Sequence, residues 1–467
     1  MGVASPVKHS STRHGRNTHL FVVSLVLVAA LPAWARENSL NAGLSLLEGY
    51  DSNLESTPTD HIYQWTTTVS PTFSFLTRSQ TDQLGLTFTP SLRFVNSETN
   101  RPGVEEASGF DKRTEEYQLQ LDAQKTFAKD YQILLNESYY KGDDPYVQNV
   151  PLWDKDRNIY ISETIQRRRY YTNNVSLGTK YAYGRGSSLS LAYSNSIYDN
   201  YELRGGYKRD NVYFASEHFF DNQWKSHFSY SFTYGDFEDE VKTPAIPDSV
   251  DIVDITTNEA TAGLDYVLSP HSTILTSYGY LNQHFERAFT DYQVHTATLG
   301  LRQELGPGST LVLSLGPSYV QAESGTTTLT YSGEWRNKLR AAQCNVGFEG
   351  GYDQRYYDAT GYGFTKYWLT KASLDMPLSS SSTTSLFTIF RRDRSADVDQ
   401  GNLREDEWQA GTTLTYQLTQ YAGLSLRYVY LKLNTNRDIN NTGQDDSYDD
   451  HRLFLELKAS SQLWRSL

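Results

Sequence analysis

Residue types that could carry hydrolytic chemistry occur along the chain, and their spacing decides whether they could work together. A membrane-associated hydrolase would need a serine beside a histidine, with an acid or amide that orients the histidine. Beyond residue 35 the histidines are His61, His218, His227, His271, His284, His295 and His451. None lies in a nucleophile motif such as Gly-x-Ser-x-Gly, and no group of histidine and cysteine has zinc-binding spacing. We therefore expect no enzymatic activity, no catalytic or metal site and no cofactor.

Composition narrows the remaining classes. The 467 residues include 55 acidic and 42 basic side chains, a formal net charge of −13. Binding to a phosphate backbone needs clustered basic side chains, so we expect no nucleic-acid partner. Cys344 is the single cysteine, which excludes an internal disulfide. A secreted chain of this length then needs another source of rigidity.

The N-terminus has the three-part layout of a secretory signal peptide. Three basic residues precede an apolar stretch, 20–31, which is too short to span a bilayer as a helix of about 20 residues. Ala33–Ala35 supplies the small residues of a cleavage site. We predict a signal peptide at residues 1–35 and one domain at residues 36–467. An uncleaved membrane anchor is the alternative.

Period-two alternation of apolar and polar residues predicts strands along the rest of the chain. Segment 81–96, TDQLGLTFTPSLRFVN, puts leucine and phenylalanine on one face and glutamine, threonine and arginine on the other. The same alternation recurs in segments 63–75, 117–123, 224–234 and 408–418. Helical spacing is nowhere sustained, so we predict an all-β chain. Pro71, Pro90 and Pro317 fall on the apolar phase, where β-bulges are one explanation.

The connections between these segments alternate between two lengths. Short, turn-like connections are expected at 77–81, 128–130, 184–187, 221–223, 269–272, 306–309, 336–338 and 378–383. Long, polar connections are expected at 96–114, 141–168, 235–258, 393–406 and 434–451. Transmembrane barrels have short periplasmic turns and longer external loops. We predict a transmembrane antiparallel up-and-down β-barrel of about 20 strands, within a range of roughly 16–22, rather than a soluble sandwich.

The wet faces of the predicted strands carry charges of both signs. A charge that faces lipid at mid-depth costs about 2–4 kcal/mol for arginine or lysine, so the charged residues should point into the barrel. The predicted lumen-lining residues are Arg93, Asp122, Glu217, His227, Asp265, Arg302, Glu334, Arg336, Lys371, Asp375, Arg427, Glu456 and Lys458. Side chains alone cannot fill so wide a barrel, so its interior holds water or folded-in loops.

Two sets of loop residues have further interpretations. The long segment 141–168 contains apolar anchors, and we interpret it as a loop that narrows the channel, with an external cap as the alternative. Asp397, Asp399 and Gly401 are spaced as in part of a calcium loop, but lack the third acid and closing glutamate of an EF-hand. We interpret the acidic loops as solvated, or as places where divalent ions bridge to lipopolysaccharide.

Three segments carry a resemblance to a known family. GYDSNLESTP at 49–58, VSPTFSF at 69–75 and HRLFLELKASSQLW at 451–464 resemble strand patterns of the β-barrel porin 2 family of Gram-negative outer membranes. The resemblance implies an outer-membrane barrel, and some members of the family are associated with exopolysaccharide export loci. It supplies no catalytic residues.

These observations together lead to one expectation with one alternative. We expect a porin-like outer-membrane barrel that gives hydrophilic solutes or exopolysaccharide a water-filled path. The alternative is a plugged, non-conducting barrel with a structural or surface-binding role. The expected partners are outer-membrane lipids, lipopolysaccharide, the barrel-assembly machinery and a hydrophilic solute or polysaccharide.

Overall fold

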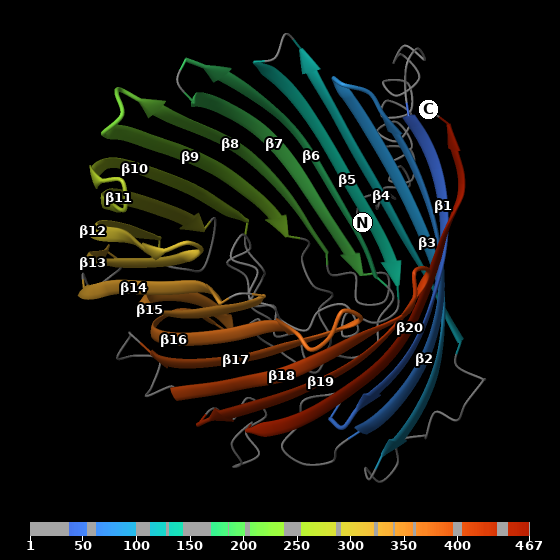
Figure 1. The fold of residues 1–467 in the computed structure, drawn as a ribbon. Helices are drawn as coiled ribbons and strands as arrows, with labels where there is room; N and C mark the ends of the chain where they lie inside the picture. The colour runs from blue at the N-terminus through green and yellow to red at the C-terminus, as the bar shows by residue number, and fades with distance from the viewer. Residues whose placement is uncertain are drawn as a thin grey trace, which may run out of the picture.

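The computed structural model describes residues 37–53, 62–99, 113–127, 130–142, 170–184, 186–200, 206–237, 254–285, 291–321, 326–339, 341–357, 361–395, 404–436 and 447–466. These residues form twenty strands (Figure 1). The strands are β1 (Glu37–Asp51), β2 (Ile62–Arg78), β3 (Asp82–Thr99), β4 (Arg113–Phe127), β5 (Tyr131–Gly142), β6 (Tyr170–Tyr183), β7 (Ser187–Asn200), β8 (Gly206–Phe219), β9 (Trp224–Phe237), β10 (Ile255–Ser269), β11 (Ser272–Phe285), β12 (Tyr292–Gly306), β13 (Ser309–Gln321), β14 (Thr326–Leu339), β15 (Ala342–Tyr357), β16 (Gly361–Pro377), β17 (Ser382–Ser395), β18 (Arg404–Thr419), β19 (Ala422–Thr435) and β20 (Tyr448–Ser466).

The strands close into a single antiparallel barrel. Each strand pairs with its neighbours in the sequence, and β20 pairs with β1 from Arg452↔Asp51 to Ser466↔Asn38. Figure 1 shows the resulting ring, with β1 and β20 side by side. Closure gives every strand two partners and leaves no sheet edge, as a lipid environment requires. The predicted up-and-down barrel and its strand number are confirmed.

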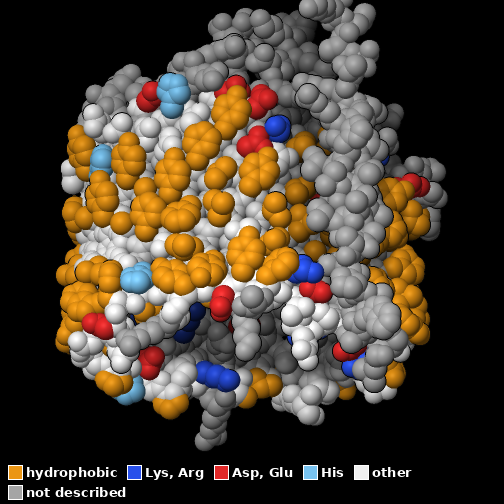
Figure 2. All heavy atoms as spheres, turned by 90° about the horizontal axis from the view of Figure 1, so that it is seen from above, with side chains coloured by type: hydrophobic (Ala, Val, Ile, Leu, Met, Phe, Trp, Pro, Cys, Tyr) orange, Lys and Arg blue, Asp and Glu red, His pale blue; other side chains and the backbone are white. Residues whose placement is uncertain are grey.

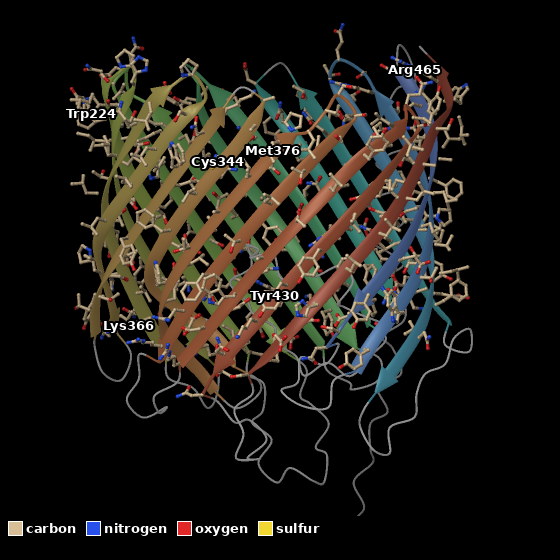
Figure 3. All side chains as sticks on the ribbon, turned by 60° about the horizontal axis from the view of Figure 1, so that its bottom comes forward. Trp224, Cys344, Lys366, Met376, Tyr430 and Arg465 are labelled. Atoms are coloured by element: carbon tan, nitrogen blue, oxygen red, sulfur yellow. The ribbon has the colours of Figure 1, made fainter. Side chains whose placement is uncertain are left out.

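The barrel has two different ends, which we call the turn end and the loop end. At the turn end short connections such as 270–271 and 307–308 join the strands, and β1 begins and β20 ends there. At the loop end the strands are joined by the longer segments. Figure 3 shows Trp224 and Arg465 near the turn end and Lys366 near the loop end. Short periplasmic turns and longer external loops place the loop end outside the cell.

An apolar band covers the outside of the barrel. Leu86 and Phe88 are exposed on β3, and Thr87 lies between them on the opposite face. Hydrophobic side chains cover the middle of the outer surface, and acidic and basic side chains lie nearer its two ends (Figure 2). Glu137 is an acidic residue within the apolar band. It lies on the outward face, because it pairs with Leu121 and Val175 of that face. No helix among the described residues is long and apolar enough to cross a membrane.

The prolines interrupt hydrogen bonding without shifting the register. The β2–β3 ladder runs from Val69↔Leu92 directly to Phe73↔Phe88, so it lapses where Pro71 faces Pro90. Proline has no N–H to donate, and no extra residue is inserted. The β12–β13 ladder lapses in the same way beside Pro317. The expected bulges are therefore wrong at these positions.

Side-chain hydroxyls on the inner face bridge the proline gap in the β2–β3 ladder. The Ser70 and Ser91 hydroxyls lie 2.7 Å apart, and those of Thr72 and Thr89 lie 3.1 Å apart. Both pairs flank the two facing prolines. Hydroxyl hydrogen bonds thus hold the two strands together over the stretch where backbone bonds are absent.

The strands extend further than the sequence predicted. The expected turn at 336–338 belongs to β14, which ends at Leu339, and β15 begins at Ala342. Arg336 and Lys338 face inward there and alternate with outward residues. A polar run of this kind therefore indicates the end of a strand and does not indicate a turn. The predicted signal peptide (1–35), most of the predicted channel loop (141–168) and the calcium-like residues 397–401 lie outside the described residues.

Candidate functional site

The strand register places all thirteen predicted lumen-lining residues on the face opposite the apolar band. They are Arg93 on β3, Asp122 on β4, Glu217 on β8, His227 on β9, Asp265 on β10, Arg302 on β12, Glu334 and Arg336 on β14, Lys371 and Asp375 on β16, Arg427 on β19, and Glu456 and Lys458 on β20. Their environments differ with their height along the barrel. That these residues line a water path remains a prediction.

Several of these residues contact one another near the turn end. Arg336 donates two hydrogen bonds of 2.9 Å to Glu334. Lys458 Nζ lies 2.9 Å from Glu456 Oε2. His227 Nδ1 lies 3.8 Å from Asp265 Oδ1, which places this inward histidine beside one acid.

The others lie apart from this set. Glu217 pairs with Lys225 at 3.2 Å, and Arg427 lies over the Phe454 ring at 5.8 Å. Apart from Arg93, the remaining four form no ion pair with any described residue, and they are Asp122, Arg302, Lys371 and Asp375. The thirteen residues therefore form separate wall contacts and do not converge on one centre.

Arg93 behaves differently from the other twelve. Its guanidinium lies 2.6 Å from Glu116 Oε1 across β3 and β4, and the two side chains are only 2% and 6% exposed. Both point inward near the loop end. Removing two charges from water is costly, and a short ion pair is what makes the burial tolerable.

A second buried ion pair lies within one strand, on the inner face of β17. Arg391 donates from Nε and Nη2 to the two carboxylate oxygens of Asp393, at 2.7 and 2.8 Å. Both side chains are 1% exposed. The Arg391 guanidinium also lies 4.8 Å from the centre of the Tyr367 ring. Bidentate geometry and ring stacking both favour arginine at this position.

A third buried cluster fastens the seam between the first and last strands. Arg452 Nε lies 2.6 Å from Asp450 Oδ2 on β20 and 3.1 Å from Asp51 Oδ2 on β1. Asp450 also accepts a hydrogen bond from the Ser52 hydroxyl at 3.1 Å. Asn53 Nδ2 donates to the Asp449 carbonyl at 3.1 Å. The two ends of the barrel sheet are thus joined by charge as well as by backbone pairing.

These clusters are part of a wider set of buried inward residues, which we call the inner belt. It consists of Gln64, Arg93, Val95, Glu116, Tyr140, Ile255, Gln283, Ser318, Val320, Leu369, Arg391, Asp393, Glu405, Gln409, Val429, Leu431, Asp450 and Arg452. Leu369 lies at the middle of β16, and the others lie in the loop-end half of their strands. Outside the belt, Ser39 near the turn end of β1 is also buried and inward. The inner belt draws on β2–β5, β10, β11, β13 and β16–β20, so it lines part of the wall.

Exposure changes sharply between the two ends of the same inner wall. At the turn end the inward side chains of Arg336 and Lys458 are 63% and 69% exposed. At the loop end Asp450 and Val429 are fully buried. Water therefore reaches these two side chains at the turn end and does not reach Asp450 and Val429.

The inner belt is suited to stabilising the barrel wall and is not suited to catalysis. Its arginines are engaged by carboxylates, so neither partner is available as a general acid or base. Among the described residues no group of three or more histidine, cysteine, aspartate or glutamate side chains could hold a metal ion. What the belt can do is fix the loop-end rim in one arrangement.

Sequence reasoning placed several belt residues in loops. Asp393 fell in the predicted loop 393–406 and Asp450 in 434–451, but β17 and β20 continue through them. Opposite charges two residues apart on one strand lie on the same face. Arg391 and Asp393, like Asp450 and Arg452, show this spacing, and it could have revealed them.

Comparisons with known proteins bear on the fold. No protein-family model matches the chain, and no curated protein matches it. Three solved structures cover 90–92% of this chain and 81–82% of theirs at 9–10% identity. They are the ferric enterobactin receptor of Pseudomonas aeruginosa (TM-score 0.51), the copper transporter OprC (0.51) and the FrpB iron transporter of Neisseria meningitidis (0.52).

The chain is an outer-membrane β-barrel that crosses the membrane with its strands. The expected open, porin-like path for hydrophilic solutes or exopolysaccharide is wrong, because these similar structures are a receptor and metal transporters. They favour the plugged alternative. The inward charges were interpreted as the lining of a water-filled path. Charged side chains on an inner wall can instead form ion pairs with one another. The resemblance to the β-barrel porin 2 family is untested by these structures and stays a prediction.

Proposed function

We propose that this chain is a surface-binding outer-membrane barrel whose lumen is occluded at the loop end, and that it catalyses no reaction. The observation that carries the proposal is the inner belt. In a water-filled pore the wall arginines and carboxylates would be hydrated. Here Arg391, Asp393 and Asp450 are at most 1% exposed.

The closed loop end fits binding from outside better than passage. A surface site needs a rim with one fixed shape, and three buried ion clusters supply rigidity at the height where the external segments begin. The comparison structures support this class, since one of them is a receptor for ferric enterobactin. The wide, exposed turn end then forms a vestibule that faces the periplasm.

Single-channel recording tests the proposal. The folded chain is inserted into planar bilayers, and folding is checked by a shift between unboiled and boiled protein on a denaturing gel. We expect no stable ohmic level. A variant with Arg391→Ala and Asp393→Ala loosens the inner belt and should add brief, noisy openings, whereas Arg302→Gln at the exposed turn end should not. A steady open level in the unaltered, folded protein would overturn the proposal.

A further inference from the structure

Three basic residues face each other on the outside of the barrel at the loop end. Lys366 on β16 lies directly opposite Arg394 on β17, which lies directly opposite Arg404 on β18. All three are exposed. They share the outward phase of Trp368 and Trp408. We call these three residues the basic row. Like charges directly opposite on neighbouring strands repel, so the row costs stability unless an anion compensates it.

One carboxylate serves the neighbouring arginines. Arg392 donates to both oxygens of Asp406, at 2.6 and 3.0 Å, and Arg404 Nη2 donates to Asp406 Oδ2 at 3.0 Å. Arg394 makes no ion pair with any described residue. Arg392 and Arg404 thus share one acid, in a chain whose formal net charge is −13. The patch is positive against the overall charge of the protein.

An aromatic platform lies next to the basic row, on the side toward the middle of the membrane. The Trp368 and Phe390 rings are 5.4 Å apart, and the Phe390 and Trp408 rings are 4.7 Å apart. The Arg392 guanidinium lies 5.6 Å from the Phe390 ring centre. Aromatic girdles of barrels mark the boundary between hydrocarbon and headgroups. The basic row therefore stands at headgroup height in the outer leaflet.

We propose that the basic row binds the phosphate groups of a phosphorylated glycolipid of the outer leaflet, of the lipid A type, while the aromatic platform packs against its sugar and acyl portion. Arginine is suited to phosphate because its planar fork donates two parallel hydrogen bonds. Elsewhere on the outward face near the loop end, Glu48 would repel an anion, and Lys208 is paired with Asp210 at 3.1 Å. This inference does not depend on whether the lumen conducts.

Binding of lipid A to the full, folded chain in detergent tests the proposal. The probe is bis-phosphorylated lipid A, with dephosphorylated lipid A and phosphatidylglycerol measured beside it by native mass spectrometry. The test variant carries Lys366→Gln, Arg394→Gln and Arg404→Gln. The matched control carries Arg302→Gln, Lys338→Gln and Lys371→Gln, which remove the same charge from the inner wall.

We expect the test variant to weaken binding of bis-phosphorylated lipid A by about tenfold or more, since it loses charge-assisted hydrogen bonds to phosphate. The control variant should bind as the unaltered chain does, and dephosphorylated lipid A should bind weakly to all three. If the test variant does not fold, Arg394→Gln alone should still weaken binding by several-fold, because its side chain supports no described ion pair. Unchanged affinity in the test variant, an equal loss in the control, or equally tight binding of phosphatidylglycerol would each overturn the proposal.

Discussion

Two bidentate ion pairs of the same geometry should differ strongly in what they contribute to stability. Arg391 and Asp393 lie two residues apart on β17, with bonds of 2.7 and 2.8 Å. Arg336 and Glu334 lie two residues apart on β14, with bonds of 2.9 Å. Both pairs face inward. Both side chains of the first pair are 1% exposed, whereas Arg336 and Glu334 are 63% and 36% exposed, so the two pairs differ chiefly in burial.

Removing one carboxylate charge from each pair measures the effect of burial. Asp393→Asn leaves the Arg391 charge buried without its bidentate partner, which costs about 3–5 kcal/mol. Glu334→Gln leaves Arg336 in water, which costs about 0–1 kcal/mol. Urea unfolding in lipid vesicles, followed by tryptophan fluorescence, gives the free energies of unfolding.

A double variant separates loss of the ion pair from loss of packing. Arg391→Met together with Asp393→Leu removes both buried charges, so it should lose less stability than Asp393→Asn alone. If Asp393→Asn and Glu334→Gln both cost less than about 1 kcal/mol, the inner belt is hydrated and the reasoning fails.

Three further outcomes follow from the barrel geometry. Phe88→Arg should reduce the folded fraction on a heat-modifiability gel, by about 2–4 kcal/mol, and Thr87→Arg should fold; equal yields would contradict the assigned faces. Arg452→Met leaves two carboxylates buried at the seam between β1 and β20, so it should cost about 3–5 kcal/mol in urea unfolding. Arg465→Met removes an exposed charge at the turn end of the same seam and should cost less than about 1 kcal/mol. A larger cost for Arg465→Met than for Arg452→Met would show that the buried cluster does not stabilise the seam. Ser91→Ala should cost about 1 kcal/mol by the same assay, since its hydroxyl bridges the gap beside the prolines, and no loss would mean the bridge is dispensable.

Period-two alternation was enough to predict the barrel because lipid imposes it on every strand. Leu86 and Phe88 must face hydrocarbon, and Thr87 between them must not, so the pattern is written into the local sequence. The ends of the strands were less visible. Near the headgroups and inside the lumen polar residues occur on both faces, so polar runs such as 336–338 and 448–450 looked like turns or loops although they are strand.

The inner belt could not be predicted in the same way. Register fixes that Arg93 points inward, but its burial depends on Glu116 of the next strand and on what covers the wall. That is a property of three-dimensional packing. The basic row was missed for a related reason, since Lys366, Arg394 and Arg404 are far apart in sequence and only strand pairing aligns them.

Thiol accessibility at two heights of one strand tests the closed loop end most directly. Gln409 and Gln417 both face inward on β18, and Gln409 is 2% exposed whereas Gln417 is exposed. In a Cys344→Ser background, Gln409→Cys and Gln417→Cys are treated with a membrane-impermeant maleimide in the folded barrel. The account predicts rapid labelling at position 417 and protection at position 409 until urea unfolds the protein. Equal labelling rates at the two positions in the folded barrel would contradict it.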